Sequence, residues 1–176
     1  MLLDDTSAEF HEFFERHYAG LARFSFLLTG EPDAADDLAA DALIALWQRW
    51  DRLRAAEHPL AYARGVVANL ARERVRSSTR ERRRIALFWA PVAQQQRSPD
   101  VAAVVDVRAA LGRLPFGKRA CVILRHAFDL SEKDTAQALG ISVGAVKSQT
   151  SKGLAELERL LGVQAAGDLA AERGSR

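Results

Sequence analysis

The sequence has only one cysteine, Cys121, among its 176 residues. A single thiol excludes an internal disulfide framework and a zinc site built from several cysteines. The residues around it (Ala120, Val122, Ile123 and Leu124) are apolar. This environment predicts a buried structural thiol, because reactive cysteines need polar, partly exposed surroundings.

Long apolar runs are also missing. The longest, IALFWAPVA at residues 85–93, is shorter than the roughly 17–25 residues that a membrane helix needs. The chain opens with MLLDDTSAEF, which is acidic where a signal peptide would be basic. We therefore expect a soluble cytoplasmic protein without membrane association.

The patterns typical of an active site are absent as well. No phosphate-cradling glycine loop and no metal-ligand spacing occurs in the chain. The four histidines, at positions 11, 17, 58 and 126, stand apart from one another without a catalytic context. We expect no enzymatic activity, no metal and no cofactor.

Charge is distributed unevenly along the chain, although the overall net charge is only +2. Residues 1–57 contain twelve acidic side chains against five arginines, whereas residues 58–100 contain nine arginines against three acids. Residues 101–176 are again basic, with eleven basic and eight acidic side chains. An acidic front suits a protein partner, and a basic remainder suits a polyanion.

Helical periodicity runs through nearly the whole chain, and no segment shows sustained alternation of period two. The apolar stripes predict helices at 8–28, 33–51 and 59–84, then further helices from Val101 onward with a break at Leu114-Pro115. We expect an all-α fold of two helical domains joined by a flexible linker. The domain boundaries that we predict are 8–88, a linker at 89–104, a second domain at 105–163 and a C-terminal tail at 164–176.

The segment DLSEKDTAQALG, residues 129–140, predicts the first helix of a helix-turn-helix. Ser131 is a good N-cap, and Asp134 stands three residues later as in a capping box. Gly140 supplies a left-handed turn residue, Ile141 fills the corner, and Ser142 caps the next helix.

The helix that follows Ser142 has an unusual surface. An apolar stripe of Val143, Val146, Thr150, Leu154, Leu157 and Leu161 predicts its buried side. The opposite side carries only small or basic residues, from Gly144 to Ala155. A helix entering a major groove about 12 Å wide needs such a low face, with basic groups for bases and phosphates. A solvated amphipathic helix is the alternative, but the capped helix and glycine turn before it favour DNA binding.

Two stretches of the first domain also point to partners. Helix 33–51 begins with several aspartates, and the helix dipole explains Asp33 and Asp36 but not Asp41, which lies two turns in. Seven arginines crowd residues 72–84, which favours phosphate contacts. Just upstream, Tyr62, Arg64 and Asn69 offer a ring, a cation and an amide suited to unstacked bases.

The order of these parts resembles an extracytoplasmic-function (group 4) RNA polymerase sigma factor of the short actinobacterial type. The matching stretches are FFERHYAGLARFSFLLTGEPDAADDLAADAL, AYARGVVANLARERVR and LPFGKRACVILRHAFDLSEKDTAQALGISVGAVKSQTSKGLAELERLL. The resemblance implies a sigma-2 domain, a linker and a sigma-4 domain. Its implied partners are core RNA polymerase (the β′ clamp helices and the β flap), promoter DNA and possible regulation by an anti-sigma factor.

The resemblance also implies roles for individual residues. Those nominated for binding core polymerase are Asp37, Leu38, Asp41, Leu43 and Trp47. Those nominated for recognising and melting the −10 element are Tyr62, Arg64, Asn69, Arg72 and Arg76. Those nominated for reading the −35 element are Lys147, Ser148, Gln149, Ser151 and Lys152.

Three other functions remain as alternatives. A one-component repressor or response-regulator-like activator would share the helix-turn-helix, but it would usually dimerise on paired half-sites and lack the acidic first domain. An enzyme would need catalytic groups that the chain does not offer. An anti-sigma-like interaction protein would have no reason to carry a DNA-reading face.

Overall fold

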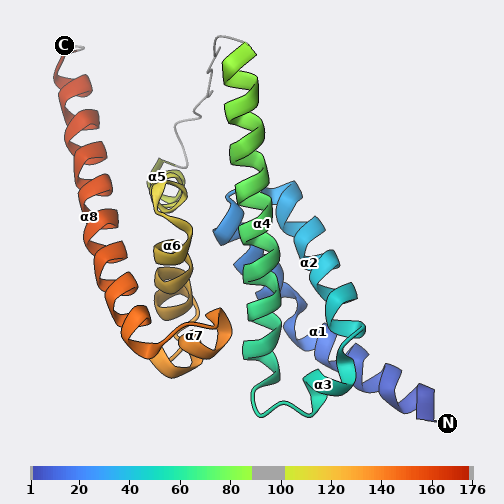
Figure 1. The fold of residues 1–176 in the computed structure, drawn as a ribbon. Helices are drawn as coiled ribbons and strands as arrows, with labels where there is room; N and C mark the ends of the chain where they lie inside the picture. Colours follow the sequence, from blue (N-terminus) through green and yellow to red (C-terminus); the bar gives the residue numbers. More distant parts are fainter. Residues whose placement is uncertain (1, 89–101, 175–176) are drawn as a thin grey trace.

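The computed structural model describes residues 2–88 and 102–174, and it describes side chains for residues 6–81 and 107–162. All regular structure within these ranges is helical, as the sequence predicts (Figure 1). The helices are α1 (Leu2–Thr29), α2 (Pro32–Trp47), α3 (Trp50–Arg54), α4 (Pro59–Phe88), α5 (Ala102–Arg113), α6 (Phe116–Val122), the π-helical turn η2 (Ile123–Ala127), α7 (Glu132–Leu139) and α8 (Val143–Gly174). Most of the predicted linker lies outside the described residues.

The first four helices form an N-terminal module around the apolar side of α1. Gly30, with a φ of 77°, ends α1, and Pro32 starts α2 at a position where its missing N–H costs nothing. Leu21, Phe24 and Leu46 are almost completely buried between α1, α2 and α4. The apolar spacing of these helices therefore predicts their buried sides correctly.

One predicted helix of this module ends a few residues earlier than expected. Residues 33–51 were expected to form one helix, but α2 ends at Trp47 and Arg49 leaves the helical conformation, with φ −121° and ψ 18°. The chain then turns into α3, where Trp50 packs against Phe10 and Phe13 with ring centroids 5.1 and 5.4 Å apart. The apolar period continues across this turn, so the spacing alone does not reveal it.

The remaining helices form a C-terminal module with the predicted helix-turn-helix. Ser131 Oγ accepts a hydrogen bond from the Asp134 amide at 3.0 Å, and Gly140 closes α7 with a φ of 63°. Ser142 Oγ accepts from the Ala145 amide at 3.1 Å and so caps α8. These caps satisfy amides that a helix start leaves unpaired.

A small apolar cluster holds the two helices of the motif against α6. It contains Cys121, Ala136 and Val146, with Ile141 packed against it. Cys121 is therefore a buried thiol, as predicted, and Ala136 permits the close approach of α7 and α8. Val143 was expected on the buried stripe but is 40% exposed, because it stands in the first turn of α8, before the helix reaches α6.

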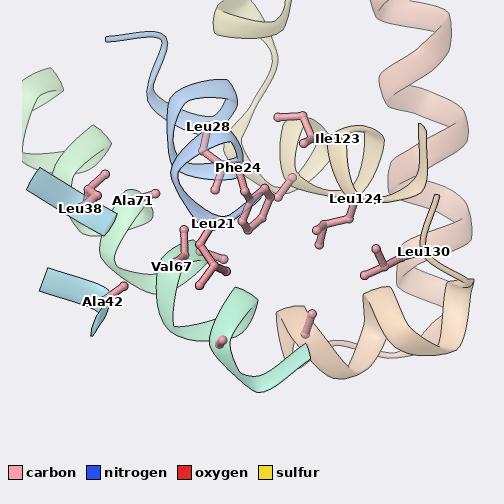
Figure 2. Packing of buried hydrophobic residues seen from close by; sticks show 14 of the residues in the cluster. Leu21, Phe24, Leu28, Leu38, Ala42, Val67, Ala71, Ile123, Leu124 and Leu130 are labelled. Atoms are coloured by element: carbon pink, nitrogen blue, oxygen red, sulfur yellow. The ribbon is translucent and has the colours of Figure 1, made fainter. Parts of the chain in front are cut away.

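The two modules pack together through one continuous hydrophobic core. Figure 2 shows Phe24 and Leu28 of α1 beside Ile123 and Leu124 of the C-terminal module. α7 lies between α8 and α4 (Figure 1) and contacts both. The two domains are thus docked, although the sequence suggested only that a linker joins them.

Helix α8 also continues farther than predicted. It was expected to end near Leu161, with a tail after residue 163, but the helix extends to Gly174. In the described part of the chain, none of the helices combines the length and apolarity that crossing a membrane requires.

Candidate nucleic-acid and protein interfaces

The first turns of α8 present a low, basic surface to solvent. Lys147, Ser148, Ser151 and Lys152 are all exposed, and they lie on the side of the helix opposite the buried Val146. Intervals of three and four residues place side chains on the same side of a helix, which brings these four together. The surface has the shape and charge that a helix needs to enter a DNA groove.

Lys147 also contacts the first helix of the motif. Its Nζ lies 3.5 Å from a carboxylate oxygen of Glu132, and the lysine side chain is 63% exposed. Exposed ion pairs contribute about 0–1 kcal/mol, so this pair can give way to a stronger partner. Glu132 therefore keeps Lys147 oriented along the motif without locking it.

Gln149 does not belong to this surface. It is half-buried, and a Cβ added at Gly117 of α6 would lie 2.2 Å from its Oε1. Its side chain thus packs against the start of α6 rather than beside the exposed lysines. Of the five residues nominated for the −35 element, the structure brings four together and places Gln149 apart.

Helix α4 exposes a second candidate surface. Tyr62, Asn69 and Arg76 recur at intervals of seven residues, and all three are exposed, Tyr62 by 38%. Seven residues make nearly two turns, so the three side chains lie along one side of α4. The tyrosine ring can stack on a base of a single strand, and the asparagine amide can hydrogen-bond to a base. The arginine can neutralise a phosphate of the same strand.

The other two nominated arginines of α4 point toward the C-terminal module. The guanidinium of Arg64 lies 5.4 Å from the ring centroid of Phe128, and that of Arg72 lies 5.3 Å from the ring centroid of Phe116. Burial lowers the pKa of Arg64, and the carboxylate of Asp134 acts against that shift. Both arginines are half-buried, unlike Tyr62 and Asn69.

The exposed side of α2 combines acids with large apolar side chains. Asp37 and Asp41 are exposed, and so are Trp47, by 46%, and Ile44, by 59%. Asp37 is partly neutralised by Arg74, whose Nη2 lies 3.6 Å away. Exposed large apolar groups beside exposed carboxylates are typical of a docking surface for a basic, amphipathic partner.

Two leucines nominated for this surface stand differently. Leu38 is 3% exposed and belongs to the core between α1, α2 and α4, so it supports the surface from below and cannot meet a partner. Leu43 is half-buried. Beside Trp47 the surface continues into an open pocket of about 530 Å³ lined by Gln48, Arg49 and Thr6 among others.

Sequence reasoning missed several residues at these surfaces. Ile44 is the most exposed large apolar side chain among the described residues, and its position three residues from both Asp41 and Trp47 could have revealed it. Phe116 and Phe128 gave no such signal, because the α4 arginines that they contact are 44 and 64 residues away in sequence.

Comparisons with known proteins agree with this arrangement. The chain matches the family models for Sigma-70 region 2 over residues 13–81 and Sigma-70, region 4 over residues 105–157. The ECF RNA polymerase sigma factor SigM of Mycobacterium tuberculosis is 31% identical over 153 residues, which are 87% of this chain and 77% of that protein. The RNA polymerase sigma-E factor of Streptomyces coelicolor is 32% identical over 162 residues, covering 87% of this chain and 86% of the relative.

A solved structure is similar across both modules. The sigma factor RpoE of Bartonella quintana, crystallised with the anti-sigma factor NepR, superposes with a TM-score of 0.71 at 26% identity. The match covers 88% of this chain and 98% of RpoE. With both sigma-70 regions in order, and with relatives above 30% identity along most of their length, the chain belongs to the family of ECF RNA polymerase sigma factors.

Proposed function

We propose that this chain binds core RNA polymerase and directs it to promoters by reading two DNA elements with its two modules. The observation that carries the proposal is a separation of charge: an acidic, apolar surface on α2 and a low, basic surface on α8. The acidic surface suits a protein and repels DNA, whereas the basic surface suits DNA. A sigma factor needs both.

The acidic surface is the part that we assign to core polymerase. Asp41, Ile44 and Trp47 would meet the β′ clamp helices, with Asp37 at the edge of the contact. The C-terminal module would meet the β flap. The apolar side chains would supply most of the affinity, and the carboxylates would set orientation and partner choice.

The DNA contacts divide between α4 and α8. Lys147, Ser148, Ser151 and Lys152 would read and hold the −35 element in its major groove. Tyr62 and Asn69, with Arg64, Arg72 and Arg76, would hold the unpaired −10 strand. A base that leaves the DNA stack loses a few kcal/mol of free energy. Its stacking on the protein and its hydrogen bonds to the protein offset that cost.

The mechanism requires no covalent chemistry. Each module binds its element weakly, but attachment to one polymerase gives the second contact a high effective concentration. The joint affinity therefore exceeds that of either contact, and only promoters with both elements are selected. A protein acting on polymerase and DNA in this way works in the cytoplasm.

Regulation by an anti-sigma factor is part of the proposal. The similar structure of RpoE contains the anti-sigma factor NepR. The match covers 98% of the RpoE chain, so a partner of that kind would have a comparable two-module surface to bind here.

In vitro transcription tests the proposal most directly. Purified core polymerase is incubated with the chain and a fragmented genome, and transcript start sites are mapped. We expect start sites that share two upstream elements at a fixed spacing and that disappear with Asp41→Arg. Transcript start sites that appear equally without the chain would refute the proposed function. A footprint of the chain alone, over one symmetric operator and without polymerase, would instead favour a repressor.

A further inference from the structure

We propose that Glu132 is a specificity-determining residue of the −35 contact: its carboxylate, held beside Lys147, rejects base pairs that present a hydrogen-bond acceptor to it. This rests on the proposed role of Lys147 in reading a base of the −35 element. It gives the first helix of the helix-turn-helix a part in DNA reading, in addition to the residues on the basic surface of α8.

The backbone of Glu132 is fixed at the start of α7. Glu132 is the first residue of that helix and directly follows its cap, Ser131. Ser131 Oγ accepts a hydrogen bond from the Asp134 amide at 3.0 Å and donates one to the Asp134 carboxylate at 2.6 Å. The cap therefore engages the carboxylate of Asp134, whereas the carboxylate of Glu132 reaches toward α8.

This contact places a negative group on a surface that is otherwise basic. Lys147 Nζ lies 3.5 Å from Glu132 Oε2, and the two side chains are 63% and 38% exposed. Both groups are thus open to a DNA molecule that approaches α8. A base edge that meets the ammonium group of Lys147 also lies within reach of the carboxylate of Glu132.

Affinity for DNA does not explain an acid at this place. A carboxylate weakens the attraction between the surface and the DNA phosphates. In the described part of the chain, Lys152 on the same surface makes no ion pair, so a lysine can stand there alone. The dipole of α7 favours an acid in its first turn by about 0.3–1 kcal/mol, but it does not require contact with Lys147.

The two side chains together match one orientation of a G·C pair. In the major groove, guanine presents the acceptors O6 and N7, and cytosine presents the N4 amino donor. O6 and N4 are hydrogen-bonded to each other, so they lie about 2.9 Å apart. A lysine donor and a carboxylate acceptor separated by 3.5 Å therefore meet guanine and cytosine at nearly the same spacing.

Other base pairs at this position are rejected by repulsion. A reversed C·G pair places the cytosine amino group against Lys147 and guanine O6 against Glu132, so both contacts are unfavourable. An A·T pair likewise sets thymine O4 against the carboxylate, whereas a T·A pair keeps the allowed order but offers the lysine only one acceptor. We expect the preference G·C, then T·A, with A·T and C·G bound most weakly.

Glu132→Gln tests the carboxylate with little change in size. The glutamine amide carries both a donor and an acceptor, so it tolerates either kind of base edge. The matched control is Glu12→Gln, the same change at an exposed acid of α1 that forms an ion pair with Arg16 at 2.6 Å. Thermal unfolding of both variants measures any effect on stability.

Binding is measured with the complex of core polymerase and the full chain, at one salt concentration. The DNA fragments carry a promoter found by start-site mapping, with each of the four base pairs placed in turn at every −35 position. Fluorescence anisotropy gives the affinity for each fragment. The base pair that Lys147 reads is the one at which Lys147→Ala relaxes the preference.

At that base pair, wild type should bind the G·C fragment about five- to a hundredfold more tightly than the C·G fragment. Glu132→Gln should lower this ratio about fivefold or more, chiefly because the C·G and A·T fragments bind more tightly. Its affinity for the G·C fragment should change less than about threefold, because the lost contact with cytosine is offset by the released Lys147. Glu12→Gln should leave all four affinities unchanged.

The outcomes separate this inference from the proposed function. If Lys147→Ala relaxes a preference but Glu132→Gln keeps the wild-type ratios, the inference is overturned; a lower melting temperature of Glu132→Gln would then assign the acid to the stability of α7 alone. If Lys147→Ala relaxes the preference at no base pair, the proposed role of Lys147 fails, and the role of Glu132 fails with it.

Discussion

Arg119 of α6 and Leu28 of α1 join the two modules across 91 residues of sequence. Arg119 Nη1 donates to the Leu28 carbonyl at 2.5 Å, and Nη2 donates to the carbonyls of Gly112 and Leu114 at 2.6 and 3.1 Å. The side chain is 6% exposed, and burial lowers the pKa of its guanidinium. An arginine nevertheless stays charged, and the carbonyl ends of α1 and α5 favour that charge.

Arg119→Ala should lower the free energy of unfolding substantially. It leaves carbonyls at the seam without their donor, and each buried unpaired group costs about 1–3 kcal/mol. We expect a loss of roughly 3 kcal/mol in urea denaturation, whereas Arg159→Ala on the exposed surface of α8 should change it by less than about 0.5 kcal/mol. Equal free energies of unfolding for Arg119→Ala and wild type would show that these hydrogen bonds contribute nothing to stability.

Binding to core polymerase should depend on the exposed side of α2. Asp41→Arg reverses a charge that faces a basic partner, and Ile44→Ala removes a large apolar side chain that is 59% exposed, so each should weaken binding about tenfold or more. Neither residue supports the core, so the helical content should be unchanged. Surface plasmon resonance with core polymerase measures the affinity. Glu158→Arg, the same charge change on α8, is the control, and an equal loss there would exclude a specific role for Asp41.

Promoter opening should depend on Asn69. Asn69→Ala should reduce open-complex formation on duplex DNA more than on a template with a pre-melted bubble, because the bubble has already met the cost of unstacking. Permanganate footprinting of unpaired thymines measures the two reactions. Equal defects on both templates would point to a role of Asn69 in folding, which the melting temperature of the variant would then reveal.

Much of the fold could be predicted from the sequence because local signals fix it. Ser131, Gly140 and Ser142 take the capping and turn roles expected of them, since those roles depend only on neighbouring residues. The end of α2 at Trp47 could not be predicted, because the apolar period continues into α3 and only packing on α1 breaks the helix. Docking of the modules was equally hidden, since it depends on residues far apart in sequence.

The candidate site was predictable to a similar degree. Periodicity placed Lys147 and Lys152 on an exposed side of α8, but the same periodicity could not show that Gln149 packs against Gly117. The match to a family pattern nominated Leu38 for a partner contact. Leu38 lies on the buried side of α2, however, and is therefore a core residue. Pattern matching names positions, and only packing shows which of them are available to a partner.

Stability should fall in alkaline solution through Cys121. Burial raises the pKa of its thiol to about 11, so the folded chain holds this proton more tightly than the unfolded chain does. The contribution is complete below about pH 9 and is lost as the pH rises toward 11, by roughly 2–3 kcal/mol in all. The contribution of the thiol is the difference in the free energy of unfolding between wild type and Cys121→Ala, measured by denaturation at each pH. If this difference stays constant from pH 8 to 11, the thiol has an ordinary pKa.

The two lysines of α8 should have different roles. Lys147 is near the start of the helix, where base edges are usually met, and Lys152 lies farther along, where the phosphate backbone passes. A lost base contact changes which sequence is preferred, by about 1–3 kcal/mol at one position. A lost phosphate contact weakens all sequences alike and reduces the salt slope by about one.

Binding of the polymerase complex to −35 variants over a range of salt concentrations separates these roles. We expect Lys147→Ala to relax the preference at one base pair, and Lys152→Ala to leave preference intact while flattening the salt dependence. Glu132→Ala should strengthen DNA binding slightly, because Lys147 then has no ion pair with Glu132 to break before it contacts DNA. An even loss across all sequences for Lys147→Ala would contradict its assignment to a base.

Ser148→Leu tests the low surface itself, since a bulky side chain there should hold the helix out of the groove and abolish −35 binding.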